Sequence, residues 1–243
     1  MTPPALVLVP GLLCDERLWR HQTEGLQDLA GPILVPGVTG QDSVQEMARS
    51  VLEAAPEQFA LAGLSMGGYV ALEIVRQAPA RVEALALLDT SARPDTPEQT
   101  KTRLALIEVA RDGGFDEVWR TLLPKIVHPE RVEDPGIVTA VGEMARSVGP
   151  EGFERQERAI IGRPDSRGDL RGIACPTLVL CGRDDPLTPL PLHEELADGI
   201  PGARLHIVDR CGHLSALERP EEITRAMREW LEALAVRGTE TPS

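Results

Sequence analysis

The chain has 243 residues, 42% hydrophobic and 26% charged, which are ordinary values for a globular protein that can bury its own core. Its formal net charge of -13 argues against a nucleic-acid partner, because nucleic acid is bound through Lys and Arg. No apolar run is long enough for a membrane span, and Pro10-Gly11 interrupts the run Ala5–Val9, so neither a secretory signal nor a membrane anchor is expected. We therefore expect a cytoplasmic protein.

Short apolar runs alternate with helical patterns along the chain. This alternation predicts a parallel β-sheet covered by helices. The runs are apolar almost throughout, which fits strands that are buried on both faces. The predicted strands are Ala5–Val9, Ile33–Val35, Gln58–Ala62, Ala84–Leu88, Thr177–Cys181 and Arg204–Val208.

Three helices are marked by their ends. Ser43 and Glu46 have the spacing of a capping box, and Pro56 ends the helix that follows them. A second helix is predicted from about Met66 to Ala78, where the next residue is a proline. The last helix is predicted to begin near Pro220.

The alternation stops between about Ser91 and Asp169. That stretch shows helical patterns only, beginning with Thr96 as cap and Pro97 at the first helical position. Because neighbouring parallel strands need only a short crossover, a segment of this length indicates an insertion. We predict a core made of residues 1–90 and 170–243, with a helical lid at residues 91–169.

The segment Gly63-Leu64-Ser65-Met66-Gly67 lies between a predicted strand and a predicted helix. A turn this sharp brings neighbouring chain segments close to the serine, and glycines two residues before and after it avoid clashes. Ser65 is therefore the candidate nucleophile. A serine hydroxyl needs a base within hydrogen-bond reach, and that base must be oriented by a third group.

Of the five histidines, His213 is the candidate base. It lies in the loop directly after the last predicted strand, where an open α/β sheet places its ligands. The other histidines fall within helical, lid or strand patterns: His21, His128, His193 and His206. Among these, His128 shows no partner in the sequence and is expected to be structural or exposed.

The acid that orients the base should follow the preceding strand. Asp185 lies in that loop, and the order Ser65, Asp185, His213 is the chain order of this type of triad. Two alternatives stay open. Asp184 is adjacent to Asp185, and Asp89 also ends a predicted strand, although Asp89 could instead cap the turn at Thr90-Ser91.

Together these motifs resemble the α/β-hydrolase superfamily, in particular its small lid-bearing branch of esterases, haloperoxidase-like enzymes and enol-lactonases. The resemblance covers nearly the full chain, through the segments LVLVPGLLCDERLW, AGLSMGGYVALEIV, CGRDDPLTP and CGHLSALERPEE. In that family the acid lies three residues after the glycine and four before the proline of its loop, a register that favours Asp185. The family's oxyanion hole uses two backbone N–H groups, which by position here belong to Leu12 and Met66.

The chain departs from the family pattern in two ways. It has Pro10-Gly11 where the family commonly has His-Gly, which puts the shape of the first loop in question. It also lacks the antiparallel hairpin that usually precedes the first parallel strand. The resemblance thus implies an α/β-hydrolase fold with a mostly parallel six-stranded sheet flanked by helices and an inserted helical lid. Without the hairpin, all six strands should be parallel.

The resemblance implies a carboxylesterase that cleaves small, largely apolar esters by a Ser-His-Asp mechanism. Ser65 excludes the branches whose nucleophile is aspartate. Since no nucleotide motif or metal-ligand spacing is visible, we expect no cofactor and no metal, and a small ester or lactone as substrate. A lactonase, a C–C bond hydrolase, a perhydrolase and a non-catalytic receptor on the same fold stay open, as does the oligomeric state.

Apolar side chains of the predicted lid are candidate walls of the substrate pocket, together with Leu12 and Leu13 in the first loop. An apolar pocket under a lid favours an uncharged acyl group of modest size. The candidates in the lid are Leu104, Phe115, Trp119, Leu122, Leu123, Ile126 and Val127.

Overall fold

A computed structural model describes residues 3–237 and contains one sheet of six strands. All neighbouring strands are parallel, in the order β2-β1-β3-β4-β5-β6. The predicted six-stranded parallel sheet is confirmed, and every strand ends within two residues of its predicted bounds. The strands are β1 (Leu6–Val9), β2 (Ile33–Leu34), β3 (Phe59–Leu64), β4 (Val82–Leu88), β5 (Thr177–Gly182) and β6 (Arg204–Val208).

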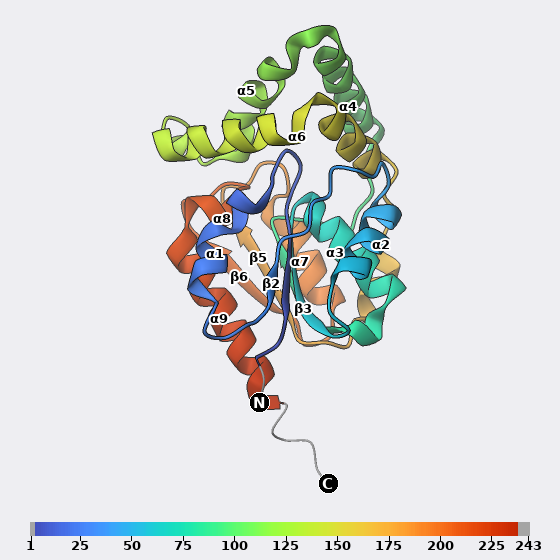
Figure 1. Cartoon of the computed structure of the whole chain (residues 1–243), viewed down its shortest axis with the longest axis vertical. Helices are drawn as coiled ribbons and strands as arrows, with labels where there is room; N and C mark the ends of the chain where they lie inside the picture. Colours follow the sequence, from blue (N-terminus) through green and yellow to red (C-terminus); the bar gives the residue numbers. More distant parts are fainter. Residues whose placement is uncertain (1–2, 238–243) are drawn as a thin grey trace.

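Helices cover both faces of the sheet, as Figure 1 shows. Alternate residues of β1 enter the two cores: Leu6 and Leu8 pack on one side, Val7 and Val9 on the other, and none is more than 1% exposed. Strands buried in this way read as continuous apolar runs, which explains the pattern in the sequence. One face carries α1 (Arg20–Gly25), α8 (Ser215–Glu218) and α9 (Pro220–Arg237), and the other carries α2 (Val44–Ala54), α3 (Met66–Gln77) and α7 (Leu190–Gly199).

The helices begin where their caps indicate. The Ser43 hydroxyl accepts a hydrogen bond from the N–H of Glu46 (3.3 Å) at the start of α2. Thr96 and Gln99 form a complete capping box at the start of α4 (Pro97–Val109), with Pro97 as the first helical residue. Short 3₁₀ helices lie at Glu16–Trp19, Pro79–Arg81, Pro129–Arg131 and Arg167–Gly172, and a short π-helical segment lies at Ala110–Gly114.

Three helices between β4 and β5 form a separate layer at one end of the sheet (Figure 1). They are α4, α5 (Phe115–Ile126) and α6 (Pro135–Ile161). The helix α6 is interrupted at Gly149, where φ is 69°, and the next residue is Pro150, which has no N–H to donate to the helix. Within residues 3–237, no helix combines the length and the apolar character that crossing a membrane requires.

Candidate active site

Ser65 occupies the sharp turn between β3 and α3, with φ of 56° and ψ of -116°. A non-glycine residue with positive φ at such a turn is strained, and this backbone conformation is typical of a nucleophile elbow. A Cβ atom on Gly63 would lie 2.2 Å from the carbonyl oxygen of Gly67, and one on Gly67 would lie 2.1 Å from that of Val9. Neither position therefore has room for a side chain.

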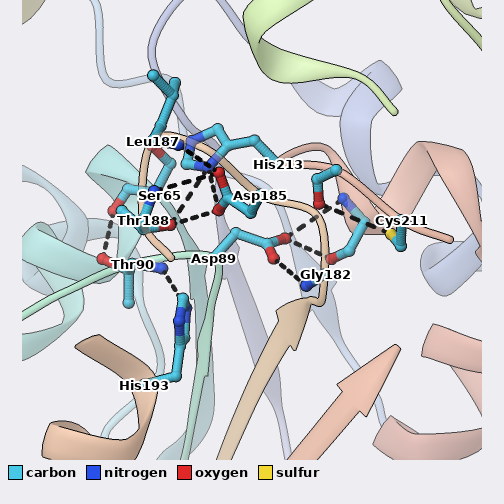
Figure 2. A network of polar contacts seen from close by, with 12 residues as sticks. Ser65, Asp89, Thr90, Gly182, Asp185, Leu187, Thr188, His193, Cys211 and His213 are labelled. Carbon is cyan, nitrogen blue, oxygen red and sulfur yellow. Dashed lines mark hydrogen bonds and ion pairs between the residues drawn. The ribbon is translucent and has the colours of Figure 1, made fainter. Parts of the chain in front are cut away.

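The Ser65 hydroxyl lies 2.8 Å from Nε2 of His213, and Nδ1 of His213 lies 2.7 Å from Oδ2 of Asp185 (Figure 2). The three side chains come from the ends of β3, β5 and β6, which are far apart in the sequence and meet at one edge of the sheet. His213 and Asp185 are 4% and 2% exposed, so water does not compete for the bonds between them.

The loop after β5 holds the Asp185 carboxylate in position. Its Oδ1 accepts hydrogen bonds from the N–H groups of Leu187 (2.8 Å) and Thr188 (3.1 Å), and its Oδ2 accepts one from the Thr188 hydroxyl (2.5 Å). Burial alone would raise the pKa of Asp185, but the proximity of His213 and the bonds from Thr188 outweigh it and lower the pKa to about 2. Asp185 is thus ionised and fixed at neutral pH.

The contact between Asp185 and His213 also changes the pKa of the histidine. Burial alone would lower the pKa of His213, but Asp185 stabilises the protonated ring and the pKa is raised above the ordinary value of 6.5. A ring in this environment can accept a proton and hold it transiently, which is what a general base for a serine hydroxyl has to do.

The two alternative acids lie elsewhere. Asp184 has a side chain that is 44% exposed, and its carboxylate lies 3.6 Å from Nε2 of His128. His128 thus has partners that the sequence did not reveal, and its backbone N–H also donates to Glu218 (2.8 Å). These partners come from distant parts of the chain, so local sequence gave no sign of them.

Asp89 is fully buried, but it does not cap the Thr90-Ser91 turn as considered from the sequence. Its carboxylate accepts hydrogen bonds from the N–H of Gly182 (3.0 Å) and from the N–H and hydroxyl of Ser215 (3.3 and 2.5 Å). The N–H of Thr90 donates instead to Nε2 of His193 (3.0 Å; Figure 2). Asp89 therefore joins the loops that follow β5 and β6.

The two backbone N–H groups expected to form an oxyanion hole belong to the loop after β1 and to the first residue of α3. As that first residue, Met66 has an N–H with no partner inside its helix. The neighbouring N–H of Leu13 donates to Oε1 of Gln156 (3.0 Å), and Leu13 itself has φ of 57°. Gln156 lies in α6 and also donates to the carbonyl of Val38 (3.2 Å), so it fixes the shape of the first loop. Sequence reasoning missed Gln156.

A cavity of about 500 Å³ opens directly above Ser65. Its walls include Leu12 and Leu13 from the first loop and Trp119, Leu122 and Ile126 from α5, as expected. The other lid candidates do not line it: Leu104 is 46% exposed, and Phe115, Leu123 and Val127 pack into the hydrophobic core.

The expectation of an apolar pocket is only partly right. Four charged side chains meet at the cavity, from α4, from α6 and from the residues just before α4 and just after α6: Asp95, Arg103, Glu157 and Arg163. Three of them line the cavity directly, whereas Asp95 lies behind Arg103 and Arg163. Their spacing in the sequence gave no signal, because residues 95 and 163 become neighbours only when the chain folds back.

Within residues 3–237, no cluster of three or more His, Cys, Asp or Glu side chains is arranged to hold a metal ion. The groups that converge on Ser65 are instead those of acyl transfer: a hydroxyl, an imidazole and a carboxylate in one hydrogen-bonded chain.

Comparison with protein families agrees with this geometry. The model of the family described as "Alpha/beta hydrolase family" matches residues 6–226. The chain belongs to the alpha/beta hydrolase family. The match spans both the six-stranded sheet and the three helices between β4 and β5, so the fold expected from the motifs is confirmed over nearly the whole chain.

Individual members of the family are similar over almost their full length. A thermophilic esterase from Thermogutta terrifontis, solved with malate bound, is 31% identical with a TM-score of 0.87, and the match covers 96% of this chain and 91% of that one. A pimeloyl-[acyl-carrier protein] methyl ester esterase from Nitrosomonas europaea is 26% identical over 90% of this chain and 92% of its own. A putative carbamate hydrolase from Azorhizobium caulinodans is 29% identical over 89% and 86%. These relatives are hydrolases, which supports hydrolase activity for this alpha/beta hydrolase.

Proposed function

We propose that the chain is a serine hydrolase that cleaves small carboxylic esters, with Ser65 as nucleophile, His213 as general base and Asp185 as the orienting acid. The observation that carries the proposal is the hydrogen-bonded chain from Ser65 through His213 to Asp185 at the floor of a cavity. Two relatives that are esterases by name favour an ester as substrate over the other bonds that this triad can cleave.

Catalysis follows from the geometry in two steps. Nε2 of His213 removes the proton of the Ser65 hydroxyl as Oγ attacks the ester carbonyl, while Nδ1–H donates to Asp185. His213 then gives the proton to the leaving alcohol. In the second step the same imidazole takes a proton from a water molecule as that water attacks the acyl-enzyme, and it returns the proton to Oγ of Ser65 as the acid leaves.

The developing oxyanion needs donors that are already in place. We assign this role to the backbone N–H groups of Leu12 and Met66, which flank the nucleophile from the loop after β1 and from the start of α3. Removing one donor of this kind typically lowers kcat by roughly 10²–10³. Gln156 takes up the N–H of Leu13, whereas no hydrogen bond among the described residues uses the N–H of Leu12.

We further propose that residues 91–169 form a lid on a core made of residues 1–90 and 170–243. The cavity supports this division, because Leu106, Trp119 and Met144 line it from α4, α5 and α6, whereas Ser65 and His213 line it from the ends of the strands. A substrate would be enclosed between the two parts, with Trp119, Leu122 and Leu13 in contact with its acyl group.

A fluorophosphonate probe with intact mass measurement tests the proposal, together with a panel of p-nitrophenyl esters of increasing chain length. We expect one covalent adduct, turnover of short esters, and loss of both in Ser65→Ala. The matched control is Ser91→Ala, a second serine that lines the same cavity and should keep its adduct. An adduct on another serine would refute the assignment, and an adduct without turnover of any ester would favour a binding role.

A further inference from the structure

The four charged side chains beside the cavity, here named the Arg103 cluster, form a continuous network. Arg103 donates from Nε to Oδ2 of Asp95 (2.7 Å) and from Nη1 to Oε2 of Glu157 (2.7 Å). Arg163 donates from Nη1 to the other oxygen of Asp95 (2.5 Å). The proposed triad uses none of these groups, and three of them line the cavity.

The cluster belongs to the same cavity as the nucleophile. The Arg163 guanidinium stacks over the ring of Tyr69, 4.3 Å from its centroid, and Tyr69 lies one turn of α3 after Ser65. Arg163 is also bonded to the carbonyls of Arg93 (3.0 Å) and Ile160 (2.8 Å), so it is held rigidly and serves as an anchor. An acyl group attached to Ser65 would therefore lie in a pocket that the Arg103 cluster lines on one side.

Two members of the cluster have hydrogen-bonding capacity that the protein leaves unused. Oε1 of Glu157 is buried and has no hydrogen-bond partner. Nη2 of Arg103 donates to no acceptor within residues 3–237. The Arg103 side chain is 22% exposed, whereas those of Asp95, Glu157 and Arg163 are at most 5% exposed. A ligand would thus meet Arg103 first, and Glu157, whose other oxygen accepts from Arg103, lines the same cavity.

The charges of the cluster limit what it can bind. Two guanidinium groups face two carboxyl groups, so the formal charges cancel, and a ligand carboxylate would add an uncompensated charge to a largely buried site. Burial raises the pKa of Glu157, and the nearby Arg103 opposes this shift. A group that both accepts and donates matches the free N–H of Arg103 together with the unpaired oxygen of Glu157.

We propose that the Arg103 cluster is a binding subsite for an uncharged hydroxyl or carboxamide group carried on the acyl part of the substrate. Its oxygen accepts a hydrogen bond from Nη2 of Arg103, and its O–H or N–H bonds to the free oxygen of Glu157. The apolar walls formed by Leu106, Trp119 and Met144 take up the carbon chain between this group and the ester. The inference rests on the proposed ester hydrolysis at Ser65 and narrows its substrate class.

The first test compares methyl esters that differ only at the far end of the acyl chain, on the wild-type protein. For acyl chains of four to six carbons, the terminal group is a methyl, a hydroxyl, a carboxamide or a carboxylate, and acid release is followed with a pH indicator. We expect kcat/KM for the hydroxyl or carboxamide ester to exceed that of the methyl-ended ester roughly tenfold or more, as one hydrogen bond to a charged group implies. Comparison of the hydroxyl-ended with the carboxamide-ended ester identifies which of these two groups the subsite binds.

The second test uses Glu157→Gln, which keeps an oxygen for Arg103 and replaces the unpaired oxygen by an amide nitrogen. The ratio of kcat/KM between hydroxyl-ended and methyl-ended esters should fall about tenfold. The control is Glu154→Gln, one turn earlier on α6, where the carboxylate pairs with Arg111 and Arg158 on the outer side. This control should keep the wild-type ratio. Fluorophosphonate labelling of each variant reports whether the active site is intact.

The outcomes separate the inference from the function on which it rests. Turnover of methyl-ended esters without preference for a hydroxyl or carboxamide, or a preference for the carboxylate, overturns the subsite and leaves the serine hydrolase standing. An unchanged ratio in Glu157→Gln with normal labelling overturns it as well. If the wild-type protein turns over no ester at all, the proposed function and the subsite are both wrong. If Glu157→Gln fails to fold, the wild-type profile alone decides.

Discussion

The Asp89 carboxylate accepts a hydrogen bond from the backbone N–H of Gly182 (3.0 Å), three residues before the proposed catalytic acid Asp185. The other oxygen of Asp89 accepts two bonds from Ser215, two residues after His213. One buried carboxyl thus fixes the loop of the acid to the loop of the base. Since the bonds of Asp89 go to Gly182 and Ser215, we expect it to position the triad and not to act as its acid.

This relationship predicts how the three candidate acids differ. Asp185→Asn should lower kcat by about 10⁴, because the amide favours the wrong imidazole tautomer. Asp184→Asn should have little effect, because its side chain is 44% exposed and pairs only with His128. Asp89→Asn should be intermediate. Steady-state kinetics on one p-nitrophenyl ester ranks the variants, and the assignment is wrong if Asp185→Asn is not the most damaging.

Asp89 should also make stability depend on pH. Burial, reinforced by the nearby Asp185, raises the pKa of Asp89 from 3.8 to about 8. The folded state therefore binds the Asp89 proton more tightly than the unfolded state does. The stability that this proton contributes is complete below pH 3.8 and is lost as the pH rises through about 8. The free energy of unfolding of Asp89→Asn minus that of wild type should rise between pH 5 and pH 9 in urea titrations. A difference that stays flat over this range would contradict the prediction.

The activity should depend on the protonation of His213. Asp185 raises the pKa of His213 above 6.5 although burial acts the other way, and only the neutral ring can take the proton of Ser65. We expect kcat/KM for a neutral ester to rise with pH through a midpoint above 6.5. In Asp185→Asn the midpoint of the fluorophosphonate labelling rate should move to lower pH. A wild-type midpoint at or below 6.5 would show that Asp185 does not stabilise the protonated ring.

The glycines around Ser65 should tolerate no side chain. Gly63→Ala places a methyl group 2.2 Å from the Gly67 carbonyl oxygen, and only a shift of the backbone can relieve this contact. We expect a loss of about 3 kcal/mol or more in the free energy of unfolding, measured in urea. Gly40→Ala is the matched control, because a Cβ atom there has no neighbour within 4 Å. Similar stability of the two variants would exclude the steric explanation.

The lid prediction concerns specificity. Trp119 is 3% exposed and lines the cavity, so Trp119→Ala should open space for longer acyl groups without touching the triad. We expect the preferred p-nitrophenyl ester to become longer, or KM to rise more than kcat falls, as when ground-state binding is removed. The neighbouring Thr121→Ala, an exposed position at the rim of the cavity, is the control. The same chain-length profile in both variants would argue against a lid.

The strands and the sharp turn could be predicted because their signals are local. A strand buried on both faces must be apolar along its length. The turn around Ser65 needs glycine at positions 63 and 67, because a Cβ atom there would lie 2.2 and 2.1 Å from a backbone carbonyl oxygen. The choice of Asp185 as the acid depended on the resemblance to the family. Asp184 and Asp89 also follow strands that end at the same edge of the sheet, so sequence spacing alone does not distinguish the three.

By itself, the sequence determined the parallel sheet, the position of Ser65 and the loops that carry Asp185 and His213, because burial and backbone sterics act over a few residues. Only the tertiary structure decided the role of Asp89 and the polar side of the cavity. Asp89 meets Ser215 across 126 residues, and Arg163 meets Asp95 across 68. A buried polar or charged group is stable only with such a partner, and which partner it has is set by how distant segments pack.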